Sequence, residues 1–363
     1  MVKADIEIET LAEFDRAVAR GSLSGCRVQS VNLLERTFAL LSADTSAAVF
    51  LGCAMEPDAA VKVRADGALV FPPVPDLPFN PYRGLLYTAD ELFAGLSEGY
   101  ENTPDAQAYA WFQESKADRD VFSSMLRSIH DDAISDALDE HLAGVRVVGV
   151  MGGHATARGA DDYRGAAELG RALTRSGLTV ATGGGPGAME AANLGAWLAT
   201  APDGALGEAL EELAKVPSFT PSVSDWARAA FAVRDRWPSG GDSVGIPTWF
   251  YGHEPPNAFA GRIAKYFANA TREDGLLARS TAGVVFLPGA AGTVQEVFDS
   301  ATPNYYASGS EPTPMVLVGR RHWTEHLPVW PLLRALARDR AMESRIALVD
   351  SVDEVPDALA ALS

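Results

Sequence analysis

The chain has 363 residues, of which 47% are hydrophobic and 21% are charged, as in a globular protein with about two domains. Its 30 basic side chains against 48 acidic ones leave a formal net charge of −18, which argues against nucleic acid or an anionic membrane as the main partner. Small anions remain possible ligands, because converging backbone N–H groups can bind phosphate in an acidic protein.

Two cysteines, Cys26 and Cys53, are too few for a disulfide framework or a structural zinc site, so we expect two reduced, buried thiols and no metal. The first residues carry acids where a signal peptide needs an apolar core. No apolar run approaches the roughly 18 residues that cross a bilayer. We therefore expect a soluble, cytoplasmic protein.

The N-terminal 100 residues are a patchwork of short apolar runs and turns without a clear repeat period, and we predict an accessory domain of mixed α/β type over residues 1–100. Residues 47–53 and 68–71 have the composition of short buried strands. The proline-rich residues 72–81 suit neither a helix interior nor a central strand, so they are predicted to form an ordered surface arm.

A helical connector is predicted over residues 101–143, where apolar side chains recur at three- and four-residue steps. Its His130-Asp131-Asp132 cluster resembles a set of metal ligands. Adjacent helical residues point in different directions, however, so a solvated polar face is the better interpretation.

Strands alternate with helices from residue 144 onward. The predicted strands, nearly pure in Val, Ile, Leu and Phe, are residues 145–150, 178–182, 243–251, 284–287, 315–318 and 346–349. The predicted helices are residues 166–176, 188–198, 258–270, a helix from 293, 327–337 and 355–362. This pattern predicts a doubly wound, Rossmann-like parallel sheet over residues 144–363, with ligands at the carboxyl ends of the strands.

Two glycine-rich turns each follow a predicted strand and precede a predicted helix. They are Gly183-Gly184-Gly185-Pro186-Gly187 and Pro288-Gly289-Ala290-Ala291-Gly292-Thr293. Glycine lets backbone N–H groups face a phosphate, and a helix N-terminus adds donors and a positive dipole end. Two such turns predict phosphate or nucleotide binding. Tight turns alone also explain glycines, and Thr293 with Glu296 fits a capping box, so both structural alternatives stay open.

Other catalytic motifs fit poorly. The glycine cluster follows the second strand, whereas a dinucleotide fingerprint follows the first, and no G-x-x-x-x-G-K-[ST] segment is present. Lys265 is the only lysine after Lys215, which disfavours a Schiff-base mechanism.

Together the two turns resemble those of the Lonely Guy family of nucleoside-5′-monophosphate phosphoribohydrolases, in which the second turn reads P-G-G-x-G-T-x-x-E. Residues 183–193 are similar to the family's first turn and residues 288–296 to its second, within a resemblance that covers roughly residues 145–363. The extra N-terminal part is reminiscent of the larger bacterial nucleotide nucleosidases. The resemblance implies hydrolysis of a nucleoside 5′-monophosphate to a free base and ribose 5-phosphate, with no cofactor.

The resemblance also assigns roles to residues. Glu296 and Arg262 would be catalytic, and residues 202–241, with Trp226 and Trp237, would form a lid or base pocket or only pack in the core. The nucleotide-binding residues would be Gly183, Gly184, Gly185, Gly187, Met189, Gly289, Gly292 and Thr293, with Gly153, His253 and Asn257 as possible pocket residues.

Two departures from the family pattern leave an alternative. Ala290 replaces the second glycine of P-G-G, and the family's Arg-Lys pair is missing. Arg262 is chosen for the arginine's role over Arg272, which is expected to be a solvated residue near the far end of the helix 258–270. The departures favour a non-catalytic nucleotide or molybdenum-cofactor-type carrier or sensor, whereas Thr293 and Glu296 favour the enzyme. The resemblance further implies a homodimer or a higher homo-oligomer.

Overall fold

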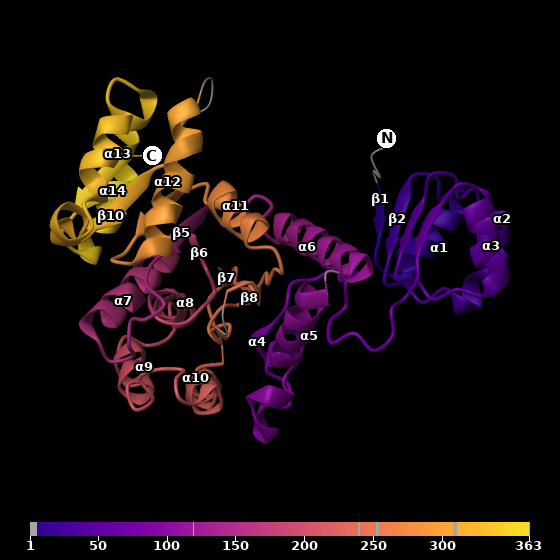
Figure 1. Cartoon of the computed structure of the whole chain (residues 1–363), viewed down its shortest axis with the longest axis horizontal. Helices are drawn as coiled ribbons and strands as arrows, with labels where there is room; N and C mark the ends of the chain where they lie inside the picture. Colours follow the sequence, from indigo (N-terminus) through magenta and orange to yellow (C-terminus); the bar gives the residue numbers. More distant parts are fainter. Residues whose placement is uncertain (1–5, 119, 239, 252–253, 308–310, 363) are drawn as a thin grey trace. The chain divides into compact units, whose positions relative to one another are not determined.

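The chain divides into two compact units (Figure 1) in a computed structural model that describes residues 6–118, 120–238, 240–251, 254–307 and 311–362. The smaller unit comprises Met1–Leu85 with Ser115–Ala137, and the larger unit comprises Leu86–Glu114 with Leu138–Ser363. Residues 144–363, predicted as one domain, lie entirely in the larger unit. The predicted connector 101–143 is shared between the two units, because only residues 115–137 belong to the smaller one.

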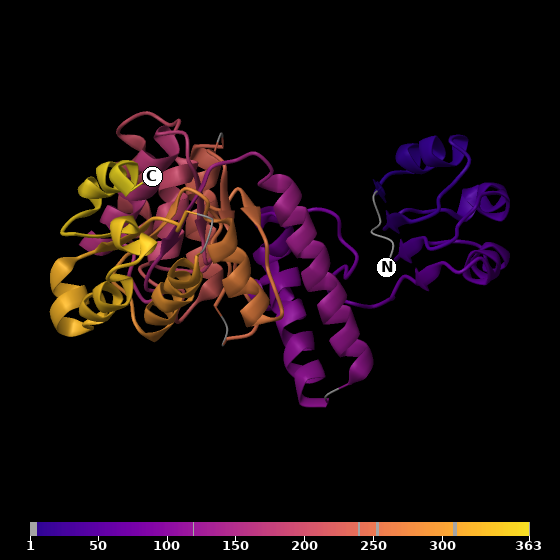
Figure 2. The same ribbon diagram turned by 90° about the horizontal axis from the view of Figure 1, so that it is seen from above.

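The smaller unit is built on a four-stranded parallel sheet in the order β1-β2-β3-β4. Its strands are β1 (Ile6–Ile8), β2 (Cys26–Gln29), β3 (Val49–Leu51) and β4 (Leu69–Phe71). Helices α1 (Leu11–Ala19), α2 (Thr37–Ser42) and α3 (Pro57–Ala65) join successive strands and cover one face of the sheet (Figures 1 and 2). The strands begin at residues 6, 26, 49 and 69, so a strand–helix unit recurs about every 20 residues. The amino-acid pattern did not reveal this repeat, because each strand has only three or four residues.

Both strands predicted in the smaller unit are present, as β3 and β4, but the expected burial of β4 is wrong, because this strand lies at the edge of the sheet and Leu69 is 60% exposed. The core lies on the other three strands. Ile8, Val28 and Phe50 are in register on adjacent strands and are at most 1% exposed. Cys26 and Cys53 are buried and free, as expected, and burial raises the pKa of the Cys53 thiol to about 11.

The predicted helical connector forms two helices, α5 (Pro104–Asp118) and α6 (Val121–His141). The expected solvated face is wrong for His130 and Asp131, which are 0% and 4% exposed. The reason is tertiary, because the imidazole packs edge-on against the Phe79 ring at 5.3 Å and its Nδ1 lies 3.0 Å from Asp131 Oδ1. Burial lowers the pKa of His130.

The larger unit is a doubly wound parallel sheet of seven strands in the order β11-β10-β9-β5-β6-β7-β8, which confirms the predicted fold class. The strands are β5 (Val147–Met151), β6 (Thr179–Thr182), β7 (Ser243–Gly245), β8 (Arg262–Ile263), β9 (Gly283–Phe286), β10 (Met315–Val318) and β11 (Ile346–Val349). The chain adds β6 to β8 on one side of β5 and then β9 to β11 on the other. The switch point therefore lies between β5 and β9, where ligands bind in such sheets.

Helices cover both faces of this sheet. Helix α7 (Asp161–Arg175) packs against α8 (Ala188–Trp197) and α14 (Val355–Leu362), whereas α12 (Ala291–Tyr306) packs against α11 (Asn269–Arg279) and α13 (Val329–Ala337). Every residue of β5, β9 and β10 is buried, as expected for strands covered on both sides. Among the described residues, no helix has the length and apolar character that a membrane crossing requires.

The predicted helix over residues 258–270 is wrong. Residues 262–263 form β8, in which Ile263 donates to the carbonyl of Tyr87 (2.8 Å) and accepts from its N–H (2.9 Å). Neighbouring side chains are buried all round, including Phe259, Ala264 and Phe267, so this segment has no solvated face to place outward. Helix α11 begins only at Asn269, a shift that changes the position of Arg272 in the fold.

Candidate functional site

The first glycine turn, residues 183–187, follows β6 and leads into α8. Gly184 has φ +69°, and a Cβ there would lie 2.5 Å from Pro247 Cδ. Gly187 has φ +72°, and its Cβ would lie 2.4 Å from the carbonyl oxygen of Gly153. Both positions therefore require glycine for close backbone approach, and the tight-turn interpretation holds at these two residues.

Asn257 and Asn193 hold this turn in place. The backbone N–H of Asn257 donates to Gly184 O (2.8 Å), and its Nδ2 donates to Gly185 O (3.2 Å) and to Asn193 Oδ1 (3.0 Å). Asn193 Oδ1 also accepts from Thr182 Oγ1 (2.7 Å), and both asparagines are 0% exposed. The predicted pocket residue Asn257 thus positions the turn through contacts that already use its side chain.

The second glycine turn, residues 288–293, leads into α12 at the switch point. The helix begins at Ala291, and no side chain caps its N-terminus. Thr293 is the third residue of α12 and is buried, whereas Ala290, Ala291 and Gly292 are exposed. The capping-box interpretation is therefore wrong. A Cβ added at Gly292 would meet nothing within 4 Å, so the helix N-terminus faces open space.

The Glu296 carboxyl lies beside the Arg272 guanidinium instead of capping the helix. Arg272 Nη1 is 3.4 Å from Glu296 Oε1, and the two side chains are 11% and 13% exposed. Arg272 Nε donates to Ile246 O (2.8 Å), and Nη2 lies 3.5 Å from Gly183 O. Arg272 thus links three segments through these contacts: the loop after β7, the first glycine turn and α12. Burial raises the pKa of Glu296, and the nearby Arg272 cation opposes that rise.

The predicted roles of the two arginines need correction. Arg262 lies exposed on the edge strand β8, and its Nη1 donates to Gly261 O (2.9 Å). Arg272 is 9% exposed in the first turn of α11, not solvated near the end of a helix. The physical reason is the missing helix over residues 258–270, which moves Arg272 to a helix start that faces the carboxyl ends of β6 and β7.

The remaining predicted residues surround the two turns. Gly153 joins them, because its N–H donates to Pro288 O (3.4 Å) and its carbonyl accepts from Ala188 N–H (3.1 Å). Met189 is 8% exposed beneath the first turn, where a Cβ at Gly183 would lie 2.6 Å from its Sδ. His253 lies outside the described residues. Its neighbour Glu254, which sequence reasoning missed, has Oε1 3.7 Å from His154 Nδ1.

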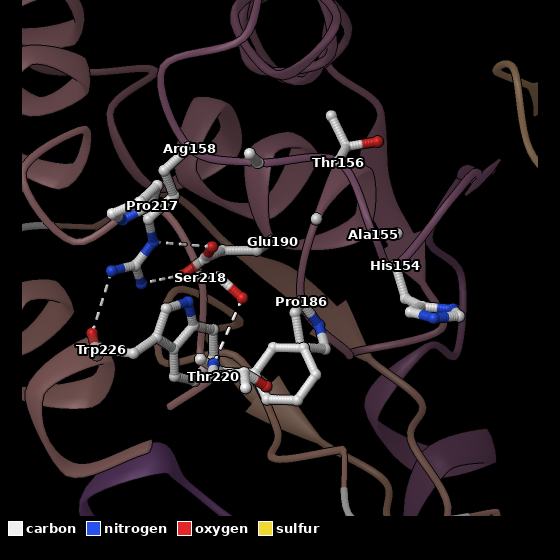
Figure 3. A pocket seen from close by; sticks show the side chains of 13 residues that line it. His154, Ala155, Thr156, Arg158, Pro186, Glu190, Pro217, Ser218, Thr220 and Trp226 are labelled. Atoms are coloured by element: carbon white, nitrogen blue, oxygen red, sulfur yellow. Dashed lines mark hydrogen bonds and ion pairs between the residues drawn. The ribbon is translucent and has the colours of Figure 1, made fainter. Parts of the chain in front are cut away.

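A cavity of about 230 Å³ opens beside the first turn (Figure 3). Arg158 and Glu190 form a buried bidentate ion pair in its wall, with Arg158 Nε 3.0 Å from Glu190 Oε2. The guanidinium lies 4.7 Å from the centre of the Trp226 ring and donates through Nη1 to Trp226 O (3.0 Å). Figure 3 shows Glu190 pointing toward Arg158. Glu190, which lies three residues after the first glycine turn, therefore stabilises the Arg158 side chain in the cavity wall.

Trp226 is 1% exposed, so it packs in the core, and it also contributes to the cavity wall. Trp237 is half-buried and lies under the Arg236 guanidinium at 4.7 Å. The segment 202–241 contains two helices, α9 (Ala205–Leu213) and α10 (Val223–Arg236).

Two segments of the chain have the G-x-S-x-G spacing of a hydrolase nucleophile turn, residues 95–99 and 241–245. Ser243 begins β7, is 0% exposed and accepts from Asn193 Nδ2 at 3.1 Å. Ser97 lies in a short 3₁₀ turn. Neither serine stands on a strand-to-helix turn, so neither has the geometry of that nucleophile.

Comparisons with known proteins give one family match, over part of the larger unit, and several distant similarities to solved structures. Residues 145–203 match the model of the SLOG cluster4 family, which covers β5, α7, β6, the first glycine turn and α8. No curated protein sequence matches the chain. Similar solved structures include the molybdenum cofactor binding protein from the phototrophic bacterium Rippkaea orientalis, with 17% identity and a TM-score of 0.38 over 60% of this chain and 97% of that chain. The Moco carrier protein from Chlamydomonas reinhardtii has 18% identity and a TM-score of 0.36, over 60% and 97% of the two chains. The protein TM1055 has 20% identity and a TM-score of 0.38, over 60% and 99%.

Proposed function

We propose that the larger unit hydrolyses the N-glycosidic bond of a nucleoside 5′-monophosphate, as a phosphoribohydrolase of the Lonely Guy type. The products are a free base and ribose 5-phosphate. One observation carries the proposal: the Glu296 carboxyl, whose side chain is 13% exposed, lies beside Arg272, about one helical turn past the exposed N-terminus of α12.

The phosphate binds at the start of α12. Unpaired N–H groups and the positive dipole end of a 16-residue helix attract an anion there, even though the protein's net charge is −18. Ala290, Ala291 and Gly292 are exposed at this end, and Gly292 leaves room for close approach of phosphate oxygens. Anchoring the phosphate holds the ribose close to Glu296.

Glu296 supplies the acid–base chemistry. Breaking the glycosidic bond builds positive charge on the sugar, which a carboxylate stabilises while it takes a proton from the attacking water. The hydroxyl of the water joins C1′ of the ribose, and the departing base receives a proton. Burial raises the pKa of Glu296, which makes the carboxylate a better proton acceptor before the same group returns the proton to the departing base.

Arg272 keeps Glu296 in position and balances its charge. Its bonds to Ile246 O and Gly183 O hold the guanidinium in one orientation, so it faces the space between the glycine turns. Arg272 therefore takes the role that the sequence had placed on Arg262.

The test measures release of free base and ribose 5-phosphate from AMP, GMP, IMP, CMP and UMP by chromatography. We expect Glu296→Gln to lower turnover about 10³-fold while nucleotide affinity changes only a few-fold. Arg272→Gln should lower turnover about tenfold to a hundredfold. Arg262→Gln is the matched control and should retain wild-type turnover. Full activity in Glu296→Gln would refute the assignment.

A nucleotide or pterin-phosphate carrier without turnover is the second candidate. The exposed Ala290 favours it, because a methyl group stands where the enzyme family has glycine next to the phosphate. Tight nucleotide binding by calorimetry without release of base, in both wild type and Ala290→Gly, would support the carrier. The expected homo-oligomer and cytoplasmic location stay predictions.

A further inference from the structure

The imidazole of His322 contacts the second glycine turn through a single ring nitrogen. His322 Nε2 lies 3.0 Å from the carbonyl oxygen of Gly289 and 3.4 Å from its backbone nitrogen, whose N–H points at the ring. One nitrogen cannot serve both groups at the same time. An Nε2 with a free lone pair accepts from the N–H, whereas an Nε2 that carries a hydrogen, in the neutral Nε2–H tautomer or in the imidazolium, donates to the carbonyl.

The fold holds His322 firmly against this turn. The residue begins a π-helical turn, η4 (His322–His326), which follows β10 after residues 319–321. Its neighbour Trp323 is 0% exposed and donates through Nε1 to Val318 O (2.9 Å), and the two rings meet edge to face at 4.6 Å. The half-buried imidazole therefore stays at Gly289 in either protonation state.

We propose that His322 positions the second glycine turn and couples anion binding at α12 to the uptake of one proton. The inference rests on the phosphate site proposed above. When Nε2 is a lone-pair acceptor, it engages the Gly289 N–H. When Nε2 carries a hydrogen, it donates to the Gly289 carbonyl and leaves the Gly289 N–H for the phosphate. The doubly protonated ring also places a positive charge beside the helix N-terminus, and this charge couples proton uptake to anion binding.

The surrounding groups favour a neutral imidazole in the free protein. Burial lowers the pKa of His322, the hydrogen bond to Gly289 raises it, the neighbouring His326 lowers it and Asp162 at the start of α7 raises it. A bound dianion shifts the balance toward the protonated ring. Affinity for the anion should therefore increase as the pH falls through the pKa of His322.

Inorganic sulfate is the appropriate probe, because it remains a dianion throughout the assay and adds no titration of its own. Its affinity is measured by competition with AMP binding between pH 5.5 and 8.0, above the isoelectric point of about 4.7. We expect sulfate to bind about tenfold more tightly at pH 5.5 than at pH 8.0, the contribution of about one hydrogen bond to a charged group.

His322→Gln tests the residue directly, because its amide can still donate to Gly289 O but does not titrate. The affinity ratio between the two pH values should fall to about twofold or less, any remainder coming from groups such as Glu296. His326→Gln is the matched control and should keep a ratio near tenfold. An unchanged affinity ratio in His322→Gln, or a sulfate affinity that does not vary with pH in the wild type, would refute the role of His322. Either result would leave the proposed phosphate site in place.

A second readout needs no variant. The ring resonances of the chain's six histidines, followed by NMR against pH, should include one whose midpoint moves upward when sulfate is added. No movement of any midpoint in a protein that binds sulfate refutes the coupling. Absence of both sulfate and AMP binding would remove the phosphate site itself, and this inference with it.

Discussion

Within the larger unit, a buried ion pair links Lys265 to Asp105 at the start of α5, and its contribution to stability can be measured. Lys265 Nζ lies 2.6 Å from Asp105 Oδ1, and the side chains are 1% and 0% exposed. Asp105 also accepts from Trp249 Nε1 (2.9 Å) and from the Tyr100 hydroxyl (2.5 Å). Lys265→Met therefore leaves a buried carboxylate that keeps two hydrogen-bond donors.

Removing one partner of a buried ion pair costs about 3–5 kcal/mol of unfolding free energy. We expect about 3 kcal/mol for Lys265→Met, because Trp249 and Tyr100 still stabilise the carboxylate. Asp105→Asn leaves the ammonium without its counter-charge and should cost about 4 kcal/mol. The double variant buries no net charge, so its cost should fall below the sum of the single costs by at least about 2 kcal/mol.

Intrinsic fluorescence isolates the relevant transition, because all seven tryptophans lie in the larger unit. Urea unfolding followed at tryptophan emission gives the three free energies, and Lys265→Met should lower the melting temperature by about 6–12 °C. A cost below about 1 kcal/mol for Lys265→Met, or single costs that simply add, would refute the argument that the pair is desolvated and coupled.

Two further outcomes are expected. Gly187→Ala should lower the free energy of unfolding by at least about 3 kcal/mol and weaken nucleotide binding, because the new Cβ meets the Gly153 carbonyl. Gly177 has φ +85° but open space around it, so Gly177→Ala should lower the free energy of unfolding by only about 1 kcal/mol. Equal losses in urea unfolding would contradict this. Turnover should rise with pH through an acid limb above the ordinary glutamate value of 4.5, since burial raises the pKa of Glu296 and the carboxylate is the working form. In Arg272→Gln the acid side of this pH profile should move to higher pH, because the cation that lowers the pKa of Glu296 is lost. A profile that stays in place would argue against the contact between Arg272 and Glu296.

The local pattern of the chain was enough to predict six of the seven strands in the larger unit's sheet, all but β8, and both glycine turns. Strands such as β5 and β9 are runs of apolar residues bounded by turns, and that composition suits only a sheet covered on both faces. Gly184 and Gly187 were recognisable because few residues other than glycine adopt their backbone angles. Glu296 was recognisable from its spacing after the second turn, although its partner was not.

Long-range packing decided the rest. Arg272 reaches Glu296 because residues 258–267 form a strand and loops, buried except around Arg262, and no periodicity within the segment predicts that outcome. Asn193 meets Asn257, and Arg158 meets Glu190, across 64 and 32 residues of chain. His130 is buried because Phe79 packs on it. Sequence by itself determined which backbone segments form strands and tight glycine turns, because glycine and apolar runs act locally. Only the tertiary structure decided which side chains meet there, because charge pairing and desolvation depend on neighbours far away in the chain.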